Sequence, residues 1–314
     1  MIIIKKTWIF LLLSMSLIFL NACGSEKKID IREIHQTGLQ YSSDFSRTVL
    51  QKGQYSAPIE DTFFELSKLG TLTYWDREKK SMISSGVLSF LPVGTGVAYA
   101  SAQGLSLWNK TKTVRICENS TDFCSDGITL FYFDNASHQI IYYNGENSNP
   151  LFSVSLTARV YTMLANKDWI VILTNEGTIV YNRENGELTS NIMEPYLNIA
   201  TIFLYADTLV QIGNAENGGL LFHLDTLVAE KLDIGHDFRE HYTVYNCICA
   251  NQQVFISISS TLLDNYDEEL WEGTVKLDCK TWEVTHLSEK YYPNLLCDEK
   301  HLYAGNGKKM ITLT

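Results

Sequence analysis

Hydrophobic and polar residues alternate along most of the chain after residue 62. The alternation is clearest at residues 128–134, 139–143, 169–174, 178–181 and 208–212, and turn-forming residues separate these runs. A period of two is the pattern of a β-strand that buries one face. No stretch of comparable length holds a helical period, so the sequence predicts an all-β protein.

The strands belong to a longer repeat: a glycine, four or five alternating residues, and then an Asp or Asn. The seven copies begin at Gly70, Gly104, Gln139, Gly177, Gly219, Gly273 and Gly307. Glycine permits a tight turn into a strand, and Asp or Asn starts the turn out of it. With a strand before and after each copy, four short strands recur about every 40 residues, which is the period of a β-propeller blade. We predict seven four-stranded blades, with six as the alternative.

The two ends of the chain are predicted to share a blade. The last unit supplies three strands, near residues 293–297, 301–304 and 310–314, and the stretch between Ile34 and Leu50 has spare β-type residues. We expect this N-terminal stretch to add the missing outer strand, which would close the ring and cover its free edges. The propeller domain is predicted to span residues 37–314.

The repeat resembles that of the quinoprotein-like (PQQ-repeat) propellers, which share their pattern with WD40-like propellers. The best match is Gly177-Thr-Ile-Val-Tyr-Asn-Arg-Glu-Asn-Gly186-Glu, whereas the other copies lack the second glycine. The dehydrogenases of that family carry a vicinal pair of cysteines over the quinone. The nearest pair here, Cys247 and Cys249, is not vicinal, so we predict no cofactor.

The N-terminus has the order of a secretion signal, with Lys5 and Lys6 before an apolar run at residues 8–20. That run is shorter than the roughly 20 residues of a membrane-spanning helix. It ends in Leu20-Asn-Ala-Cys23, which resembles the lipobox of bacterial lipoproteins. The resemblance implies a signal peptide at residues 1–22, a diacylglyceryl group on Cys23 and a lipidated tether at residues 23–36. Two acyl chains give stable membrane attachment, so we expect an extracytoplasmic protein, on the outer leaflet of the plasma membrane if the host is Gram-positive.

The net charge of the chain is −11, and removal of the signal would take away two lysines and no acid. Such an acidic protein is not expected to bind nucleic acid or to dock directly on anionic lipid headgroups.

Six cysteines follow Cys23, and an even number in an exported protein suggests disulfides. Their positions suggest otherwise. Cys124, Cys249 and Cys297 fall near the end of an innermost strand, where other blades have alanine, and Cys117 and Cys124 would lie on opposite edges of adjacent blades. Because a disulfide needs Cα atoms within about 7 Å, we predict free and mostly buried thiols.

No catalytic or metal-binding motif is recognisable in the sequence. His236 and His241, with Asp264 and Asp267, could form a mixed histidine and carboxylate site. Scattered side chains of solvated loops are the interpretation that we favour, so we predict no metal site.

The repeat is stretched between Gly219 and Gly273, with extra residues at 233–242 and 261–273. In propellers these two types of loop open onto the same face. The aromatic residues and arginine there are typical of binding hot spots, although the insertion could also lack a function. The predicted rim consists of His236, Arg239, His241, Tyr266, Trp271, Tyr291 and Tyr292.

The sequence therefore predicts a lipid-anchored propeller that acts as a non-catalytic binding or scaffold module. Its expected partners are the membrane, through Cys23, and an unidentified envelope protein. The alternatives are a hydrolase or lyase acting on glycans or peptides at the mouth of the central channel, and a sensor of small ligands. Acidic side chains converging on that mouth would favour the enzyme, and an apolar or wet channel would favour the binding module.

Overall fold

The computed structural model of the chain describes residues 27–34, 44–47, 49–56, 62–77, 79–146, 148–153, 159–192, 199–213, 218–234, 241–262, 271–298 and 300–313. These residues form 28 β-strands in seven sheets and one short 3-10 helix, η1 (Ile31–Glu33). Among them, no helix is long and apolar enough to cross a bilayer.

The seven sheets are numbered as blades in chain order. Blade 1 contains β3 (Thr62–Leu66), β4 (Leu72–Asp76) and β5 (Lys79–Ser84); blade 2 contains β6 (Val87–Val93), β7 (Gly96–Ser101), β8 (Gly104–Trp108) and β9 (Thr113–Cys117). Blade 3 contains β10 (Phe123–Ser125), β11 (Leu130–Asp134), β12 (Gln139–Tyr143) and β13 (Ser148–Ser153); blade 4 contains β14 (Val160–Ala165), β15 (Trp169–Thr174), β16 (Gly177–Asn182) and β17 (Leu188–Ile192). Blade 5 contains β18 (Ile199–Tyr205), β19 (Thr208–Gly213), β20 (Gly218–His223) and β21 (Val228–Asp233); blade 6 contains β22 (His241–Ala250), β23 (Gln253–Leu262), β24 (Trp271–Asp278) and β25 (Val284–Ser288). Blade 7 contains β26 (Asn294–Cys297), β27 (Leu302–Gly305), β28 (Lys309–Thr312) and β1 (Ile29–Asp30).

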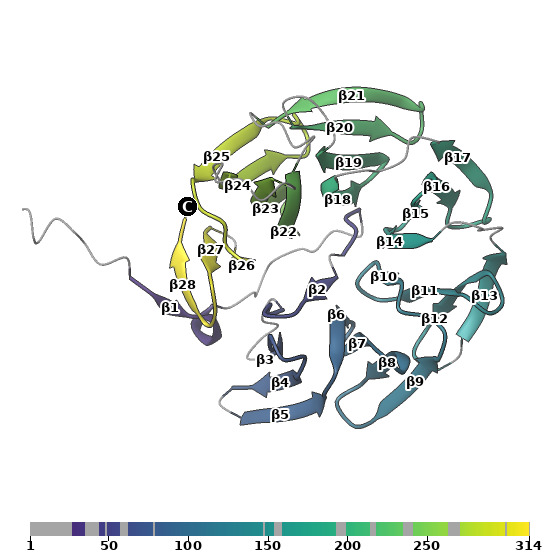
Figure 1. Cartoon of the computed structure of the whole chain (residues 1–314), viewed down its shortest axis with the longest axis horizontal. Helices are drawn as coiled ribbons and strands as arrows, with labels where there is room; N and C mark the ends of the chain where they lie inside the picture. The colour runs from purple at the N-terminus through teal and green to yellow at the C-terminus, as the bar shows by residue number, and fades with distance from the viewer. Residues whose placement is uncertain are drawn as a thin grey trace, which may run out of the picture.

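The blades stand around a central axis as a seven-bladed β-propeller (Figure 1), which confirms the predicted fold and blade count. Each blade is an antiparallel sheet that starts at its innermost strand. We call the face that carries the turns between first and second strands the lower face. The upper face carries the turns between second and third strands and the connections between blades.

The repeat residues act in the turns as the sequence predicts. The Asn182 side-chain oxygen accepts hydrogen bonds from the amides of Glu184 and Asn185 at 2.9 and 3.2 Å. The Asp278 carboxylate accepts from the amides of Lys280 and Thr281 at the same two distances. These side-chain oxygens serve as acceptors for turn amides that have no partner across the sheet.

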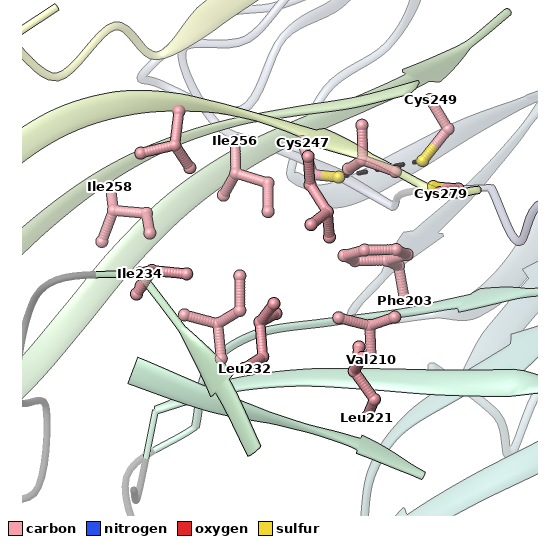
Figure 2. Packing of buried hydrophobic residues seen from close by; sticks show 14 of the residues in the cluster. Phe203, Val210, Leu221, Leu232, Ile234, Cys247, Cys249, Ile256, Ile258 and Cys279 are labelled. Carbon is pink, nitrogen blue, oxygen red and sulfur yellow. Dashed lines mark hydrogen bonds between the residues drawn. The ribbon is translucent and has the colours of Figure 1, made fainter. Parts of the chain in front are cut away.

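Hydrophobic side chains pack between adjacent blades, because alternate residues of each strand point to opposite neighbours. Figure 2 shows the packing of blade 5 against blade 6, where Phe203 and Val210 face Cys247 and Ile256. Similar clusters join the other blades, so the core is a ring of inter-blade layers.

An N-terminal strand closes the ring, as predicted, but it is β1 rather than a strand from the stretch between Ile34 and Leu50. Ile29 pairs with Met310, and Asp30 pairs with Lys309. The prediction of its location was wrong, and β1 lies within residues 23–36, which we had assigned to the tether. The next residues fasten it further, because Ile31 and Ile34 are buried between blades 7 and 1.

Acidification is expected to weaken this closure. The Asp30 carboxylate accepts a hydrogen bond from the Arg32 guanidinium at 2.9 Å and lies 3.2 Å from the Lys309 ammonium group. The bond to Arg32 holds the pKa of Asp30 well below its usual range. A group with a depressed pKa stabilises the folded state above its unfolded pKa of about 4, and this contribution is lost as the pH falls through the folded value. Urea unfolding of the wild type should become easier below about pH 4, by more than in Asp30→Asn. Equal pH dependence in the two proteins would contradict this assignment.

Residues 44–47 and 49–56 lie inside the ring, a path that the sequence did not predict. Phe45 pairs with Tyr205 of blade 5, and the Arg47 amide donates to the Ser125 carbonyl of blade 3 at 3.3 Å. The next strand, β2 (Leu50–Gln51), pairs with the inner edge of β6 and lies inside the ring in Figure 1. We call residues 44–53 the channel segment.

The chain then becomes the innermost strand of blade 1. The Gly53 amide donates to the Leu66 carbonyl at 2.7 Å, and Tyr55 pairs with Glu65. These residues take the place of a first strand along the inner edge of β3, although the regular sheet of blade 1 consists of β3, β4 and β5, and β2 forms a fifth strand on the sheet of blade 2.

Candidate functional site

The channel segment fills much of the central channel and crosses it from face to face. At the lower face, the Asp44 carboxylate pairs with the Lys167 ammonium group at 2.8 Å. The Asn166 side-chain amide donates to the carbonyls of Asp44 and Ala206, at 3.0 Å each. The hydrogen bond from Gly53 to Leu66 lies at the upper end of blade 1. The axis of this propeller is therefore occupied by its own chain.

Beside the channel segment remains a cavity of about 140 Å³. Its walls come from the inner edges of blades 1, 2, 3, 6 and 7, and include Arg47, Tyr55, Leu91, Asn246 and Cys249. The wall residues combine apolar side chains with amide, hydroxyl and thiol groups and one guanidinium group. Such a space holds a few water molecules or a very small ligand.

The thiols near the cavity belong to the hydrophobic core between blades 5 and 6. Cys247 and Cys249 point the same way from β22, with their sulfur atoms 3.9 Å apart, and Cys279 lies beside them in the cluster of Figure 2. The hydrogen bond between the pair, together with burial, raises the pKa of Cys249 well above its usual value. Burial likewise raises the pKa of Cys279. Because the thiolate is the reactive form, Cys249 and Cys279 are poor nucleophiles, and all three cysteines pack as small core residues.

All six cysteines after Cys23 are free thiols, and five of them are buried, which confirms the prediction made from their positions. Cys117 lies on the outer strand of blade 2 and Cys124 on the innermost strand of blade 3. Burial raises the pKa of Cys297 to about 12.

Blade 6 carries the predicted rim and differs from its neighbours. Its first two strands, β22 and β23, each have ten residues, whereas the corresponding strands of the other blades have three to seven. At about 3.3 Å per residue, they extend roughly 10 Å further than those of the longest other blade. The extension is at the upper face, because the lower turn between Ala250 and Gln253 is as tight as those elsewhere.

The extension carries two of the predicted rim residues. His241 is the first residue of β22 and pairs with Leu262, and Trp271 is the first residue of β24 and pairs with Ser260. Their backbones therefore lie at the same upper end of one sheet. The side chains of His241 and Trp271, and His236, Arg239 and Tyr266 as a whole, lie outside the described residues.

The two tyrosines of the predicted rim have different surroundings. Tyr291 is half-buried, and burial followed by the charge of Glu272 raises its pKa. Tyr292 is buried in the cluster between blades 6 and 7, and its amide donates to the Ser257 hydroxyl at 2.6 Å. Tyr291 thus contributes to the rim surface more than Tyr292, which has a packing role.

Within the described parts of the chain, no group of three or more His, Cys, Asp or Glu side chains is arranged to hold a metal ion. The mixed site that we considered at His236, His241, Asp264 and Asp267 lies largely outside those parts.

The fold is shared with solved propeller structures of very different sequence. A computationally designed protein, Ika8, superposes with a TM-score of 0.55 at 11% identity, over 90% of this chain and 99% of its own. A chain of a mitotic checkpoint complex has the same score at 8% identity, over 91% and 90%. The extracellular domain of BT4673 from B. thetaiotaomicron scores 0.50 at 11% identity over 91% of this chain, which spans 40% of that protein's chain. At these identities the likeness shows the fold alone.

No protein-family model matches the chain. No curated protein matches it either. The resemblance to the quinoprotein-like repeats therefore stays a prediction from the sequence.

Proposed function

We propose that this chain is a lipid-anchored, extracytoplasmic β-propeller that binds a partner protein without catalysing a reaction. The observation that carries the proposal is the extended upper end of blade 6, where His241 and Trp271 begin two strands of the same sheet. This end of the sheet is raised above the neighbouring blades and its sequence is rich in aromatic residues, which suits a protein–protein contact.

The occupied channel supports this proposal over the alternative of an enzyme that acts on glycans or peptides. Small-molecule sites are concave pockets, and the cavity beside the channel segment has a volume of about 140 Å³. This volume suits water or a very small ligand better than a glycan or a peptide. The cavity is compatible with a small-ligand sensor, and the extended end of blade 6 is the observation that favours a partner surface.

The proposed anchor rests on the lipobox-like residues that end at Cys23. It is compatible with the fold, because β1 begins at Ile29 on the outside of blade 7. Acylation at Cys23 would therefore attach the outer edge of the ring to the membrane. Mass spectrometry of the mature N-terminal peptide tests this step directly.

Affinity capture from native membranes after gentle crosslinking tests the binding function. The lipidated wild type is compared with Trp271→Ala combined with Arg239→Ala. Truncation of hot-spot residues costs about 2 kcal/mol or more each, so we expect capture of the partner to fall by tenfold or more.

The matched control is Tyr161→Ala combined with Arg115→Ala, which removes an exposed aromatic residue and an exposed arginine from blades 4 and 2. It should capture as much partner as the wild type. Equal capture by the rim variant and this control would refute the assignment of the rim.

A further inference from the structure

One part of the upper face differs in charge from the rest of this acidic chain. Three segments meet there: residues 51–54, 67–71 and 84–88 of blades 1 and 2. They contain two lysines and no Asp or Glu, although the whole chain has 36 acidic residues. We call these three segments the acid-free face.

The acid-free face is one continuous surface. The Val87 amide donates to the Gly70 carbonyl at 2.9 Å, which joins the turn of blade 1 to the start of blade 2. Gly70 has a φ of +83°, and a Cβ there would lie 2.9 Å from the Val87 oxygen and 3.5 Å from the Cε atom of Lys52. A glycine thus permits this close approach, and Lys52 lies over the same turn.

Two large apolar side chains project from this surface. Leu69, at the tip of the turn, is 91% exposed, and Leu88, on the other side of the contact between Gly70 and Val87, is 45% exposed. Lys68 adjoins Leu69, with its Cγ atom 3.5 Å from a Cβ placed at Gly53. Glu118, in the connection from blade 2 to blade 3, is paired with Arg115 at 2.9 Å. Exposed leucines flanked by lysines are the composition of surfaces that lie at the boundary of headgroups and acyl chains.

The attachment point of the chain lies on the neighbouring blade. If Cys23 is acylated, only residues 23–28 separate the lipid from β1. Six extended residues span at most about 20 Å. β1 lies on the outside of blade 7, next to blade 1 (Figure 1), so the anchor keeps this side of the ring near the bilayer. Because β1 runs antiparallel to β28, its N-terminal end points toward the lower face, and the choice of the upper face rests on the composition of the acid-free face.

We propose that the acid-free face rests on an anionic phospholipid bilayer, with Leu69 and Leu88 in the interface and Lys52 and Lys68 against the headgroups. This inference rests on the anchor in the proposed function and adds an orientation to it. The net charge of the chain suggested no contact with anionic lipid, but net charge averages over the whole surface, whereas docking depends on the local surface within about a Debye length. Only blades 1 and 2 make this contact, and the ring is tilted so that the longer strands of blade 6, on the same face, clear the bilayer.

Lysine labelling on vesicles tests this orientation. The acylated mature protein is placed in phosphatidylcholine vesicles with and without phosphatidylglycerol, and in detergent micelles. A water-soluble acetylating reagent is added, and the rate at each lysine is followed by mass spectrometry. Lys52 and Lys68 should react about fivefold more slowly on anionic vesicles than in micelles. This factor corresponds to the attraction of about 1 kcal/mol between one lysine and an anionic membrane surface. Lys231 and Lys280, on the opposite blades, should react equally in both.

Two variants separate docking from simple proximity to the membrane. Leu69→Asp changes a fully exposed turn residue and should restore the labelling of Lys52 and Lys68 while the protein stays acylated and bound to vesicles. Leu227→Asp, at an exposed turn of blade 5, should leave the protection unchanged. If mass spectrometry shows that the protein is acylated, and Lys52 and Lys68 are labelled equally in vesicles and micelles, the proposed docking face is refuted and the anchor is not. An unmodified Cys23 would instead overturn the anchor.

Discussion

Replacing Phe45 with alanine should lower the free energy of unfolding by about 3 kcal/mol, which is typical for a buried phenylalanine. Phe45 is 3% exposed, belongs to the cluster between blades 5 and 6, and lies 4.6 Å from the Tyr205 ring between centroids. Its loss would leave a cavity next to an existing one, and would free the segment that crosses the channel. Urea unfolding followed by circular dichroism measures the change.

The structure also specifies where the damage should appear. Ser46 donates its amide to the Leu204 carbonyl and accepts from the Leu204 amide through its hydroxyl, at 2.9 Å each. Hydrogen exchange at Leu204 should therefore accelerate in Phe45→Ala, because the segment that covers this inner strand loses its anchor. Ile128→Ala, at a residue that is 83% exposed, is the control and should change stability by less than about 0.5 kcal/mol. Unaltered stability of Phe45→Ala would mean that the channel segment does not support the ring.

The sequence predicts the blades better than it predicts the path of the N-terminus. Each repeat forms its own hairpins, so local signals such as Gly177 and Asn182 suffice to locate the strands and turns. The same reasoning found the buried thiols, because Cys124 and Cys297 both lie near the end of an innermost strand, where the neighbouring blades cover them.

The path of the N-terminus depends on pairings that have no local signature. β1 has only two residues, Ile29 and Asp30, and β2 also has two, so neither shows an alternating pattern. The β-type residues near Leu50 indicate a strand but not the edge that it joins, and both the inner edge of blade 2 and the outer edge of blade 7 were open to it. The tertiary structure resolves this choice by burying Phe45 and Leu50 along the axis.

The rim of blade 6 illustrates a different limit. The long interval between Gly219 and Gly273 predicted extra residues, and the structure uses some of them to lengthen β22 and β23. Sequence spacing could not show that Tyr292 is buried, because this depends on the neighbouring blade, whose residues Leu295 and Leu302 pack in the same cluster. The acid-free face was missed for a similar reason, since its segments are up to 37 residues apart in the chain.

Removing the guanidinium group of Arg183 should destabilise the protein by about 3 kcal/mol, because it leaves a mostly buried carboxylate without its partner. Arg183, in a lower turn of blade 4, reaches Asp126 in a lower turn of blade 3 at 2.8 Å, with side-chain exposures of 23% and 10%. It also donates to the Asn166 carbonyl at 2.7 Å and lies over the Phe131 ring, 4.8 Å from its centroid. One side chain thus joins two blades through charge, hydrogen bonding and ring contact.

A double-mutant cycle distinguishes the charge pair from the other contacts of Arg183. Asp126→Asn removes the charge but keeps the side-chain oxygen that accepts from the Ile128 and Thr129 amides at 2.9 and 2.7 Å. Combined with Arg183→Met, it should cost less than the sum of the two single variants, because the double variant buries no unpaired charge. Arg115→Met, whose partner Glu118 is exposed, should cost less than about 1 kcal/mol. If the Arg183 and Asp126 variants were additive, the pair would have no energetic coupling, and any effect of Arg183 on the contact between blades 3 and 4 would come from its other contacts, such as that with the Phe131 ring.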